Sequence, residues 1–546
     1  MNTHTTANFT AANFTADIVV VGAGAAGCVL AARLSEDPSL SVLLLEAGGE
    51  DSNPWIHIPA GFAKTIGNPA LDWRFETEPA PGLAGRRIPL PRGKVLGGTT
   101  AINGMLYIRG TPPDYDGWRD AGNPGWGWND VLPYFIRAEN NTRGANAFHG
   151  ADGPLSVSDI PHDPLSDAFL RASGEAGFPV LEDFNGASQE GASYYQMMTR
   201  RGRRASTARA YLKAARNRAN LQVVTGAQAT RILFDGKRAS GVEFVRGGAK
   251  QTAAARREVL ITSGALQSPQ LLQLSGIGPA ELLGRHGIPV LHDLPGVGEN
   301  LQDHLQVRMI YRCNRPVTIN DILNSKIRTA LEGAKYLFGR TGLLAHVIFR
   351  SGLFARSSFA PEGWPDLQIH FGLLSFDRMG APPHPFPGFT VSVCQLRPTS
   401  RGWVRIGSND PLAAPVIHAD YLSTDTDCRV MTEAVQLARR IAAQPSLAAY
   451  IDHEYSPGAA CASAEQMLDH VRKTSGTVHH PVGTCRMGND ALAVVDHRLR
   501  VRGVQGLRVI DGSVMPTINS GNTTAPIVMI GEKAADMIRD DLNTEV

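Results

Sequence analysis

The sequence predicts a mixed α/β protein in which a parallel sheet near the N-terminus is joined by a second, separate sheet. The first sheet is indicated by a β-branched run at residues 18–21 that leads into a glycine-rich turn and a helical stretch, which is the order of a βαβ unit. The second is indicated by strand-like runs at 307–313, 367–371 and 390–396, the first of which mostly alternates apolar with polar residues. At 546 residues, the chain is long enough for two large domains.

The N-terminal βαβ unit, residues 17–49, carries the motif GAGAAG in its first turn. Gly22 permits the tight turn, Gly24 lets the backbone approach a pyrophosphate, and Gly27 lets the helix pack close to the strand. A helix expected at 28–35 directs free N–H groups and the positive end of its dipole toward the phosphates. The sequence therefore predicts a Rossmann-like dinucleotide site.

An acidic residue ends the second strand of this unit. The strand is expected at 41–45, and Glu46 follows it nineteen residues after Gly27, close to the ~20 expected of the acid that binds a ribose 2′-hydroxyl. A glutamate there disfavours a 2′-phosphate, so NADP is not expected. The other GxG pairs, at 276–278 and 296–298, lack the third glycine. One dinucleotide site is therefore predicted, and the fingerprint by itself leaves both FAD and NAD open.

The composition excludes several classes of function. With 53 basic and 51 acidic side chains the net charge is +2, which gives no electrostatic case for binding nucleic acid or an anionic membrane. The short basic run at 200–204 is typical of a solvated turn. The six cysteines include no CxxC pair, so neither a metal site nor a redox dithiol nor a disulfide framework is indicated. They are expected to be reduced and mostly buried in a cytoplasmic protein.

Three segments bear on disorder and on membranes. Residues 1–16 are polar and lack both a basic start and an apolar core, so a disordered tail is expected there and a signal peptide is not. The apolar stretch 18–34 is broken by three glycines and an arginine, so neither it nor any other segment is predicted to span a membrane. The amphipathic stretch 342–354 leaves open a substrate entrance or a peripheral membrane contact, with core packing as the default interpretation.

Four further blocks carry a family resemblance. They are RGKVLGGTTAINGMLYIRG at 92–110, GALQSPQLLQLSGIG at 264–278, HHPVGTCRMG at 479–488 and the C-terminal segment 507–538. With the N-terminal fingerprint they resemble, in order, the glucose-methanol-choline (GMC) oxidoreductases, and especially the bacterial choline dehydrogenase-like and alcohol dehydrogenase branch. The resemblance implies an enzyme that uses FAD. It therefore decides between FAD and NAD, which the fingerprint left open.

The resemblance also implies where FAD is held. Gly98 and the small residues around it let the backbone run close under a flat ring system, and Asn103 can hydrogen-bond a ring or phosphate edge. Some family members attach FAD through a histidine at the position that is Ile102 here, so non-covalent FAD is expected. A helix expected at 525–538, with a threonine cap, would bring its N-terminus to the pyrimidine edge of the flavin. The residues expected to bind the cofactor are Gly22, Gly24, Ala25, Ala26, Gly27, Glu46, Ala47, Arg92, Gly97, Gly98, Thr99, Asn103, Gly104, Met105, Leu106, Ser263, Gly264, Asp511, Gly512, Asn522 and Thr523.

Alcohol oxidation moves a hydride to flavin N5 and a proton from the alcohol oxygen to a base, which favours histidine near neutral pH. The resemblance assigns this role to His480. Adjacent side chains on an extended segment point opposite ways, so His479 is expected to face away from the flavin. Asn522 matches the second catalytic position of the family. It is expected to hydrogen-bond the substrate oxygen and can also cap the final helix.

The substrate and the electron acceptor are less determined. Gln306 stands where choline-acting relatives carry a glutamate that holds the trimethylammonium charge. Because a buried cation without a counter-charge is costly, a neutral primary alcohol is expected in preference to choline. The acceptor is left open between a quinone or other acceptor and O2, with the bacterial blocks favouring a dehydrogenase over an oxidase. Choline dehydrogenase and a hydroxynitrile lyase-like enzyme that keeps FAD without net redox chemistry remain the alternatives.

Two intertwined domains are expected. Residues 17–155, 203–305 and 478–546 should form a discontinuous FAD-binding domain. The intervening segments, 156–202 and 306–477, should form a sheet-based substrate-binding domain that roofs the flavin.

Overall fold

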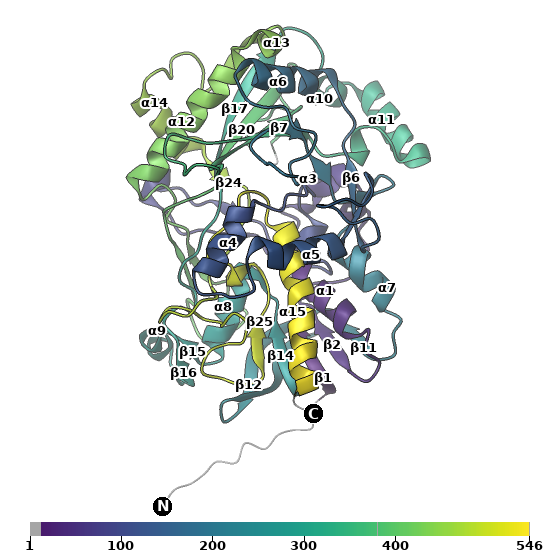
Figure 1. Cartoon of the computed structure of the whole chain (residues 1–546), viewed down its shortest axis with the longest axis vertical. Helices are drawn as coiled ribbons and strands as arrows, with labels where there is room; N and C mark the ends of the chain where they lie inside the picture. The colour runs from purple at the N-terminus through teal and green to yellow at the C-terminus, as the bar shows by residue number, and fades with distance from the viewer. Residues whose placement is uncertain (1–12, 379–380, 545–546) are drawn as a thin grey trace, which may run out of the picture.

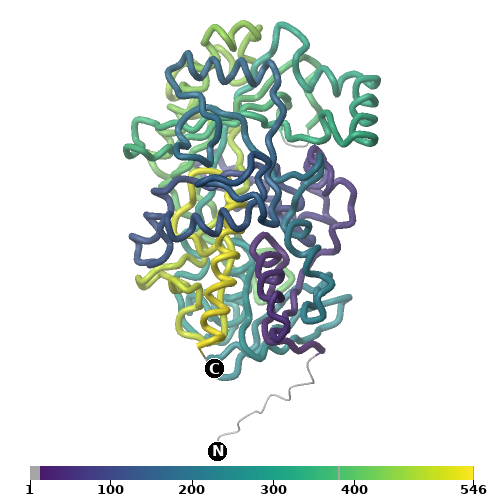
Figure 2. The backbone as a smooth tube through the Cα atoms, turned by 45° about the vertical axis from the view of Figure 1, so that its right-hand side comes forward, coloured from purple at the N-terminus to yellow at the C-terminus, as the bar shows by residue number. Residues whose placement is uncertain are grey.

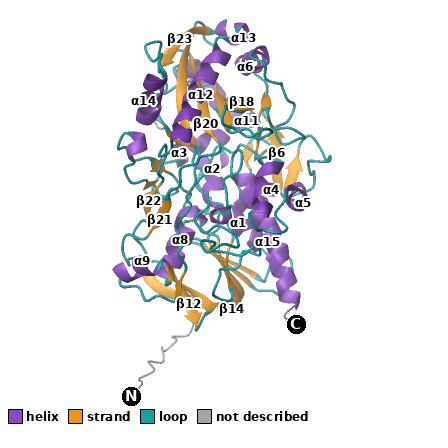
Figure 3. Ribbon diagram, turned by 60° about the vertical axis from the view of Figure 1, so that its left-hand side comes forward, coloured by secondary structure: helices purple, strands orange, loops and turns teal. Residues whose placement is uncertain are grey.

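Two seven-stranded sheets organise the chain in the computed structural model, which describes residues 13–378 and 381–544. They lie in opposite halves of the elongated molecule, and α4 (Pro112–Asp120) and α5 (Trp128–Ala138) lie near its middle (Figure 1). With strands coloured separately from helices, the same separation is visible from another side (Figure 3). The chain therefore builds an α/β architecture around two centres, as the sequence predicts.

The first sheet has the order β11-β2-β1-β14-β13-β12, and β25 also pairs with β14. Strands β11, β2, β1, β14 and β25 run parallel, whereas β13 is antiparallel to both β12 and β14. The bounds are β1 (Phe14–Val21), β2 (Val42–Leu45), β11 (Leu221–Val224), β12 (Ala227–Asp235), β13 (Arg238–Arg246), β14 (Ala249–Ile261) and β25 (Leu507–Val509). The apolar runs of β1 and β2 place apolar side chains on both faces, which suits their position because the strands of a parallel sheet are covered on both sides.

Strand β1 begins earlier than the predicted strand. Phe14, Thr15 and Ala16, which the sequence assigned to a disordered tail, instead pair with residues 253–255 of β14. The ring of Phe14 lies 5.9 Å from that of Phe244 on β13, measured between centroids. The prediction was wrong at these three residues because a long neighbouring strand supplies hydrogen bonds that composition does not reveal. Residues 1–12 of the predicted tail lie outside the described residues.

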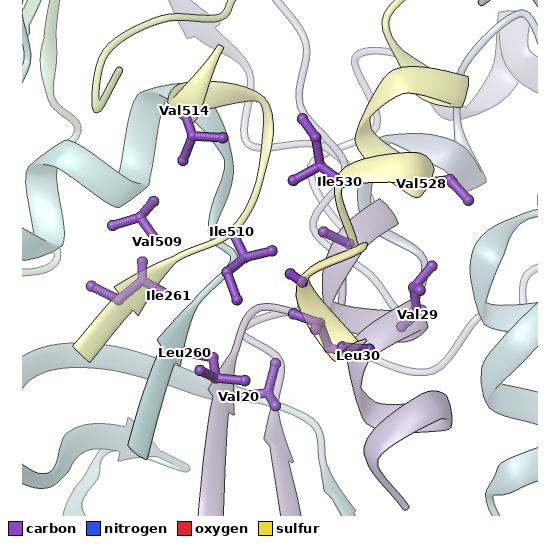
Figure 4. Packing of buried hydrophobic residues seen from close by; sticks show 14 of the residues in the cluster. Val20, Val29, Leu30, Leu260, Ile261, Val509, Ile510, Val514, Val528 and Ile530 are labelled. Carbon is purple, nitrogen blue, oxygen red and sulfur yellow. The ribbon is translucent and has the colours of Figure 1, made fainter. Parts of the chain in front are cut away.

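Two helices from opposite ends of the chain pack together beside this sheet. Helix α1 (Ala25–Leu34) begins three residues before the predicted helix, and α15 (Thr524–Thr544) continues six residues beyond the predicted end. Their backbones run side by side (Figure 2), and a Cβ at Gly531 would lie 3.1 Å from Val29 Cβ. Their apolar side chains meet the sheet in one core (Figure 4), which includes Val20, Val29, Leu30, Leu260, Ile261, Val509, Ile510, Val514, Val528 and Ile530.

The second sheet has the order β23-β17-β20-β19-β18-β7, with β24 also pairing with β17, and all of its pairs are antiparallel. The bounds are β7 (Gly191–Tyr194), β17 (Leu305–Cys313), β18 (Phe349–Ala355), β19 (Leu367–Gly372), β20 (Gly388–Gln395), β23 (Ile451–Ser456) and β24 (Gly476–Thr477). The three predicted strands are confirmed as β17, β19 and β20, which are neighbours. The limits of the two domains stay a prediction.

Strand β17 of the second sheet has one face in a hydrophobic core and one face toward a cavity. Val307 and Met309 of β17 belong to a core that also contains residues of α6 (Pro164–Glu175) and α12 (Asp425–Ala442). The alternate residues, Gln306 and Arg308, line a cavity instead. The period of two along the strand therefore separates packing residues from residues available to a ligand.

The stretch 342–354 packs inside the molecule. Leu343 and Val347 are buried, and Val347 and Phe349 line the same cavity, so this stretch combines core packing with a place in the cavity wall. Exposed apolar side chains, among them Phe338, lie on the preceding helix α11 (Lys326–Gly339). Within the described part of the chain, no helix combines the length and the apolar character needed to cross a membrane.

Candidate active site

A cavity extends from the parallel strands of the first sheet to the facing side of the second sheet. Five parallel strands each contribute a residue at or just beyond the carboxyl end: Gly22 after β1, Glu46 after β2, Ala227 beyond β11, Thr262 after β14 and Asp511 beyond β25. In open α/β sheets, ligands bind beyond the carboxyl ends of the strands because side chains and loops converge there. The topology of the sheet therefore sets the position of the site.

The glycine-rich turn leaves space for a ligand and none for side chains. Gly22 has a φ of +106°, and a Cβ there would lie 2.7 Å from the Thr262 carbonyl oxygen. A Cβ on Gly27 would collide with the Gly22 carbonyl oxygen and lie 2.7 Å from Thr262 Oγ1. Helix α1 begins after Gly24, which provides no side-chain cap, so its first N–H groups stay free beside the cavity. This cradle fits the pyrophosphate of a dinucleotide.

Glu46 is held as an acceptor at the edge of the cavity. One carboxylate oxygen accepts a hydrogen bond from Ala23 N at 2.8 Å, and the other accepts from Gly48 N at 2.7 Å. Burial raises the pKa of Glu46 to about 7, against the opposing effect of these two bonds. Each carboxylate oxygen keeps a lone pair, so the group can accept from ribose hydroxyls as well. Its role as the ribose acceptor stays a prediction.

Most of the predicted cofactor-binding residues line this cavity, and two do not. Gly27 lies inside α1, against the turn, and Gly97 has a φ of +91° and donates its N–H to the Ala23 carbonyl at 2.8 Å. Both shape the cradle without forming its surface. Ile102, the position of the flavin-linked histidine in some relatives, lines the cavity and offers no nucleophile. Non-covalent FAD therefore stays the expectation.

Arg204 holds one wall of the cavity from behind, which the sequence did not reveal. It belongs to the basic run that was interpreted as a solvated turn, yet it is buried. Its guanidinium donates to the Asn103 backbone oxygen at 2.7 Å, to Asn103 Oδ1 at 2.8 Å and to the Ile56 carbonyl at 2.8 Å. Asn103 Nδ2 donates to Thr524 Oγ1 at 3.2 Å. The Asn103 amide is therefore engaged within the protein and keeps one N–H for a ligand.

The two predicted catalytic residues lie together. His480 and Asn522 both line the cavity, and Asn522 Nδ2 is 3.2 Å from His480 Nε2. His304 lies behind them, with its Nδ1 at 3.1 Å from His480 Nδ1 and its Nε2 at 3.0 Å from the Leu396 carbonyl oxygen. His304 precedes Gln306 by two residues, and no motif in the sequence singled it out.

This chain of contacts determines which ring nitrogens carry protons. A carbonyl oxygen only accepts, so His304 Nε2 carries a proton toward Leu396. Burial lowers the pKa of His304 to about 3 and that of His480 well below its usual range, so both rings are neutral. His304 Nδ1 is then an acceptor, and His480 Nδ1 donates to it. His480 Nε2 is then unprotonated and accepts from Asn522 Nδ2 at the cavity lining, where a substrate hydroxyl can replace the amide as its donor, as a general base requires.

Asp303 positions both histidines through their backbones. Its Oδ1 accepts from His480 N at 2.7 Å and from His304 N at 2.9 Å, and its Oδ2 accepts from the Tyr421 hydroxyl at 2.6 Å. Burial raises the pKa of Asp303, while these hydrogen bonds and the charge of Arg92 oppose the rise. Asp303 does not line the cavity, so its contribution is to hold the residues that do.

His479 also lines the cavity, so the strict alternation that was expected of the pair does not hold, while its orientation relative to the flavin stays a prediction. The alternation rule holds for extended backbone, but His479 has a φ of +67°, in the left-handed region. The turn brings both histidines to the same side. Burial, with the nearby charges of Arg92 and Arg308, lowers the pKa of His479 to about 3.

Gln306 is a neutral part of the wall that is held by two hydrogen bonds. Its Nε2 donates to the Thr477 carbonyl at 3.1 Å, and its Oε1 accepts from the Ser392 hydroxyl. The side chain therefore faces the cavity as a fixed amide and carries no charge for a cation.

The chain resembles known flavoenzymes along its whole length. The N-terminal and C-terminal models of the GMC oxidoreductases match residues 16–306 and 398–531. The oxygen-dependent choline dehydrogenase of Escherichia coli K12 is 45% identical over 533 residues, which cover 96% of this chain and 95% of that protein. A solved pyridoxine 4-oxidase from Mesorbium loti is 34% identical, with a TM-score of 0.87 and coverage of 96% of this chain and 99% of that one. A formate oxidase from Aspergillus oryzae RIB40, solved to follow FAD modification, is 26% identical, with a TM-score of 0.92 and coverage of 97% and 99%. The chain therefore belongs to the GMC oxidoreductase family, and FAD is its cofactor.

Proposed function

We propose that the protein oxidises a primary alcohol to an aldehyde, with His480 as the base. The observation that carries the proposal is the Nε2 lone pair of His480, which faces the cavity because His304 occupies the other ring nitrogen. The alcohol hydroxyl would take the place of the Asn522 N–H at this nitrogen and give it its proton, and Asn522 Nδ2 would then hydrogen-bond the alcohol oxygen instead. When bound, FAD supplies a two-electron acceptor at N5 for the hydride that leaves the carbinol carbon. The carbon–oxygen double bond of the aldehyde forms as the proton and the hydride leave.

The similar proteins support an alcohol as the substrate class, since choline and pyridoxine, for which two of them are named, are both alcohols. The identity to choline dehydrogenases favours choline as the second candidate. Against it, Gln306 is neutral and is held as an amide by Thr477 and Ser392, so this place in the cavity wall offers no carboxylate to a trimethylammonium group.

The test is anaerobic mixing of the FAD-loaded protein with benzyl alcohol, with short aliphatic primary alcohols and with choline, followed by absorbance of the flavin. Bleaching by a neutral alcohol supports the proposal, and bleaching by choline alone supports the second candidate. Oxidised flavin with every alcohol, together with cleavage of a cyanohydrin, would assign a lyase instead. The rate at which colour returns in air, compared with the rate after adding a quinone, then separates an oxidase from a dehydrogenase.

His304→Phe is expected to lower kcat by about 10–100-fold, the usual effect of losing a hydrogen bond that orients a histidine. Phenylalanine keeps the ring shape but removes the acceptor for His480 Nδ1, so that the proton can move to Nε2 and block the base. The measurement is the rate of flavin reduction at saturating alcohol, with flavin content per chain as the check on folding. A rate within twofold of the wild type would show that His304 does not set the tautomer.

A further inference from the structure

An arginine without a partner lies in the cavity wall. Arg308 follows Gln306 by two residues on β17, so both side chains emerge on the face that lines the cavity. The Nε of Arg308 is shielded from solvent and has no hydrogen-bond partner among the described residues. The Phe376 ring lies 5.1 Å from the guanidinium carbon and supports it on one side. Arg308 as a whole is half-buried, and a guanidinium that is partly withdrawn from water with unused donors is stabilised when a counter-charge meets it.

The described residues around Arg308 supply no such counter-charge. The carboxylates of the cavity lining are Glu46 and Asp511, which follow β2 and β25 of the opposite sheet and are engaged there by backbone N–H groups. Burial lowers the pKa of Arg308 to about 10 with no acidic group opposing it, so the guanidinium is still charged at neutral pH. Gln306 and the neutral His370, which also line the cavity, add no negative charge.

The register of the sheet places the backbone of Arg308, on β17, four residues beyond His304, although its charge still acts on His479, the neighbour of the base. Arg308 is opposite Ser392 of β20, which is opposite His370 of β19, so the three share the face toward the cavity. Two residues correspond to roughly 7 Å along a strand. Arg308 is thus about that distance beyond Gln306, and further from His304, which contacts His480. We therefore expect a group held by Arg308 to lie at the end of the substrate opposite its hydroxyl.

We propose that Arg308 binds an anionic group of the substrate, so that the substrate is a primary alcohol carrying a carboxylate at its far end. This inference rests on the proposed alcohol oxidation and specifies its substrate class. A guanidinium binds a carboxylate through charge-assisted hydrogen bonds, and its free donors face the cavity where the distal end of the alcohol lies. The same charge repels choline, which agrees with the neutral Gln306.

The first measurement compares kcat/KM for 4-(hydroxymethyl)benzoate and benzyl alcohol, which differ only in the carboxylate. The wild type is expected to prefer the carboxylate by about 10–100-fold, the range of a charge-assisted contact. Arg308→Met should abolish this preference, and Arg308→Lys should keep part of it. Arg312→Met is the matched control, because Arg312 lies on the same strand, is exposed and does not line the cavity. It should leave the ratio unchanged.

The second measurement needs no turnover. The FAD-loaded protein is titrated with 4-methylbenzoate, which lacks the hydroxyl, and binding is followed by the shift of the flavin absorbance. Binding that weakens at least tenfold in Arg308→Met supports the anion site even if no alcohol reduces the flavin, in which case the proposed function alone fails. The inference would be overturned if benzyl alcohol reduces the flavin, the wild type shows no preference for the carboxylate, and 4-methylbenzoate binds both proteins equally or not at all. The proposed function would then still stand.

Discussion

His480→Ala lowers kcat by about 10²–10⁴, the usual contribution of a general base. The substitution removes the Nε2 lone pair that faces Asn522 and leaves the other contacts of the cavity in place. The measurement is the rate of flavin reduction by a saturating alcohol in the absence of air, at equal flavin content. His453→Ala is the matched control, since His453 is exposed on β23, opposite the exposed Arg312, and does not line the cavity, so its rate should match the wild type. A His480→Ala protein that binds FAD and reduces it at the normal rate would contradict the assignment.

The pH profile gives the same assignment a second test. Burial, with His304, His479 and Arg92 close by, holds the pKa of His480 well below its usual 6.5. The base acts in its unprotonated form, so a lowered pKa keeps it competent as the pH falls through 6.5. The acid limb of kcat/KM for a neutral alcohol is therefore expected below pH 6.5. An acid limb at or above that pH would mean that His480 is not held neutral as the geometry requires.

Gly27→Ala is expected to destabilise the protein by about 3 kcal/mol or more and to abolish its flavin content. A Cβ at this position would collide with the Gly22 carbonyl oxygen, which is backbone and cannot rotate away, so the cost lies at or above the upper range for overpacking. The turn must open and the N-terminus of α1 must move from the cradle. The measurements are the midpoint of urea unfolding and the flavin absorbance per chain.

Substitutions at Gly49 and Gly24 distinguish an effect on packing from an effect on cofactor binding. Gly49→Ala is the control, because a Cβ there meets nothing within 4 Å, and stability and flavin content should both stay at the wild-type level. At Gly24 a Cβ would lie 3.7 Å from the Thr262 carbonyl oxygen, an ordinary contact, but it would enter the space beside the N-terminus of α1. Gly24→Ala should therefore fold and bind FAD more weakly. Full flavin content in Gly27→Ala would refute the close-packing argument.

The sequence by itself determined the local parts of this protein. Gly22, Gly24 and Glu46 belong to one contiguous strand–turn–helix–strand unit, so periodicity and glycine positions were enough to predict both its fold and its ligand class. The strands β17, β19 and β20 were likewise visible as alternating or β-branched runs. The choice of His480 and Asn522 came from the family resemblance, since nothing in their spacing of 42 residues places them 3.2 Å apart.

Tertiary structure alone decided the chemistry of the site. His304 lies 176 residues from His480 in the chain, and Leu396 lies 92 residues from His304, yet their contacts set the tautomer of the base. Arg204 contacts Asn103 across 101 residues, and its burial could not be predicted from a basic run that looked solvated. His479 turned toward the cavity through a single backbone angle. Arg308 could be recognised as a charge without a partner among the described residues only once every neighbouring strand was in place, because a missing counter-charge is a property of the assembled cavity and not of any segment.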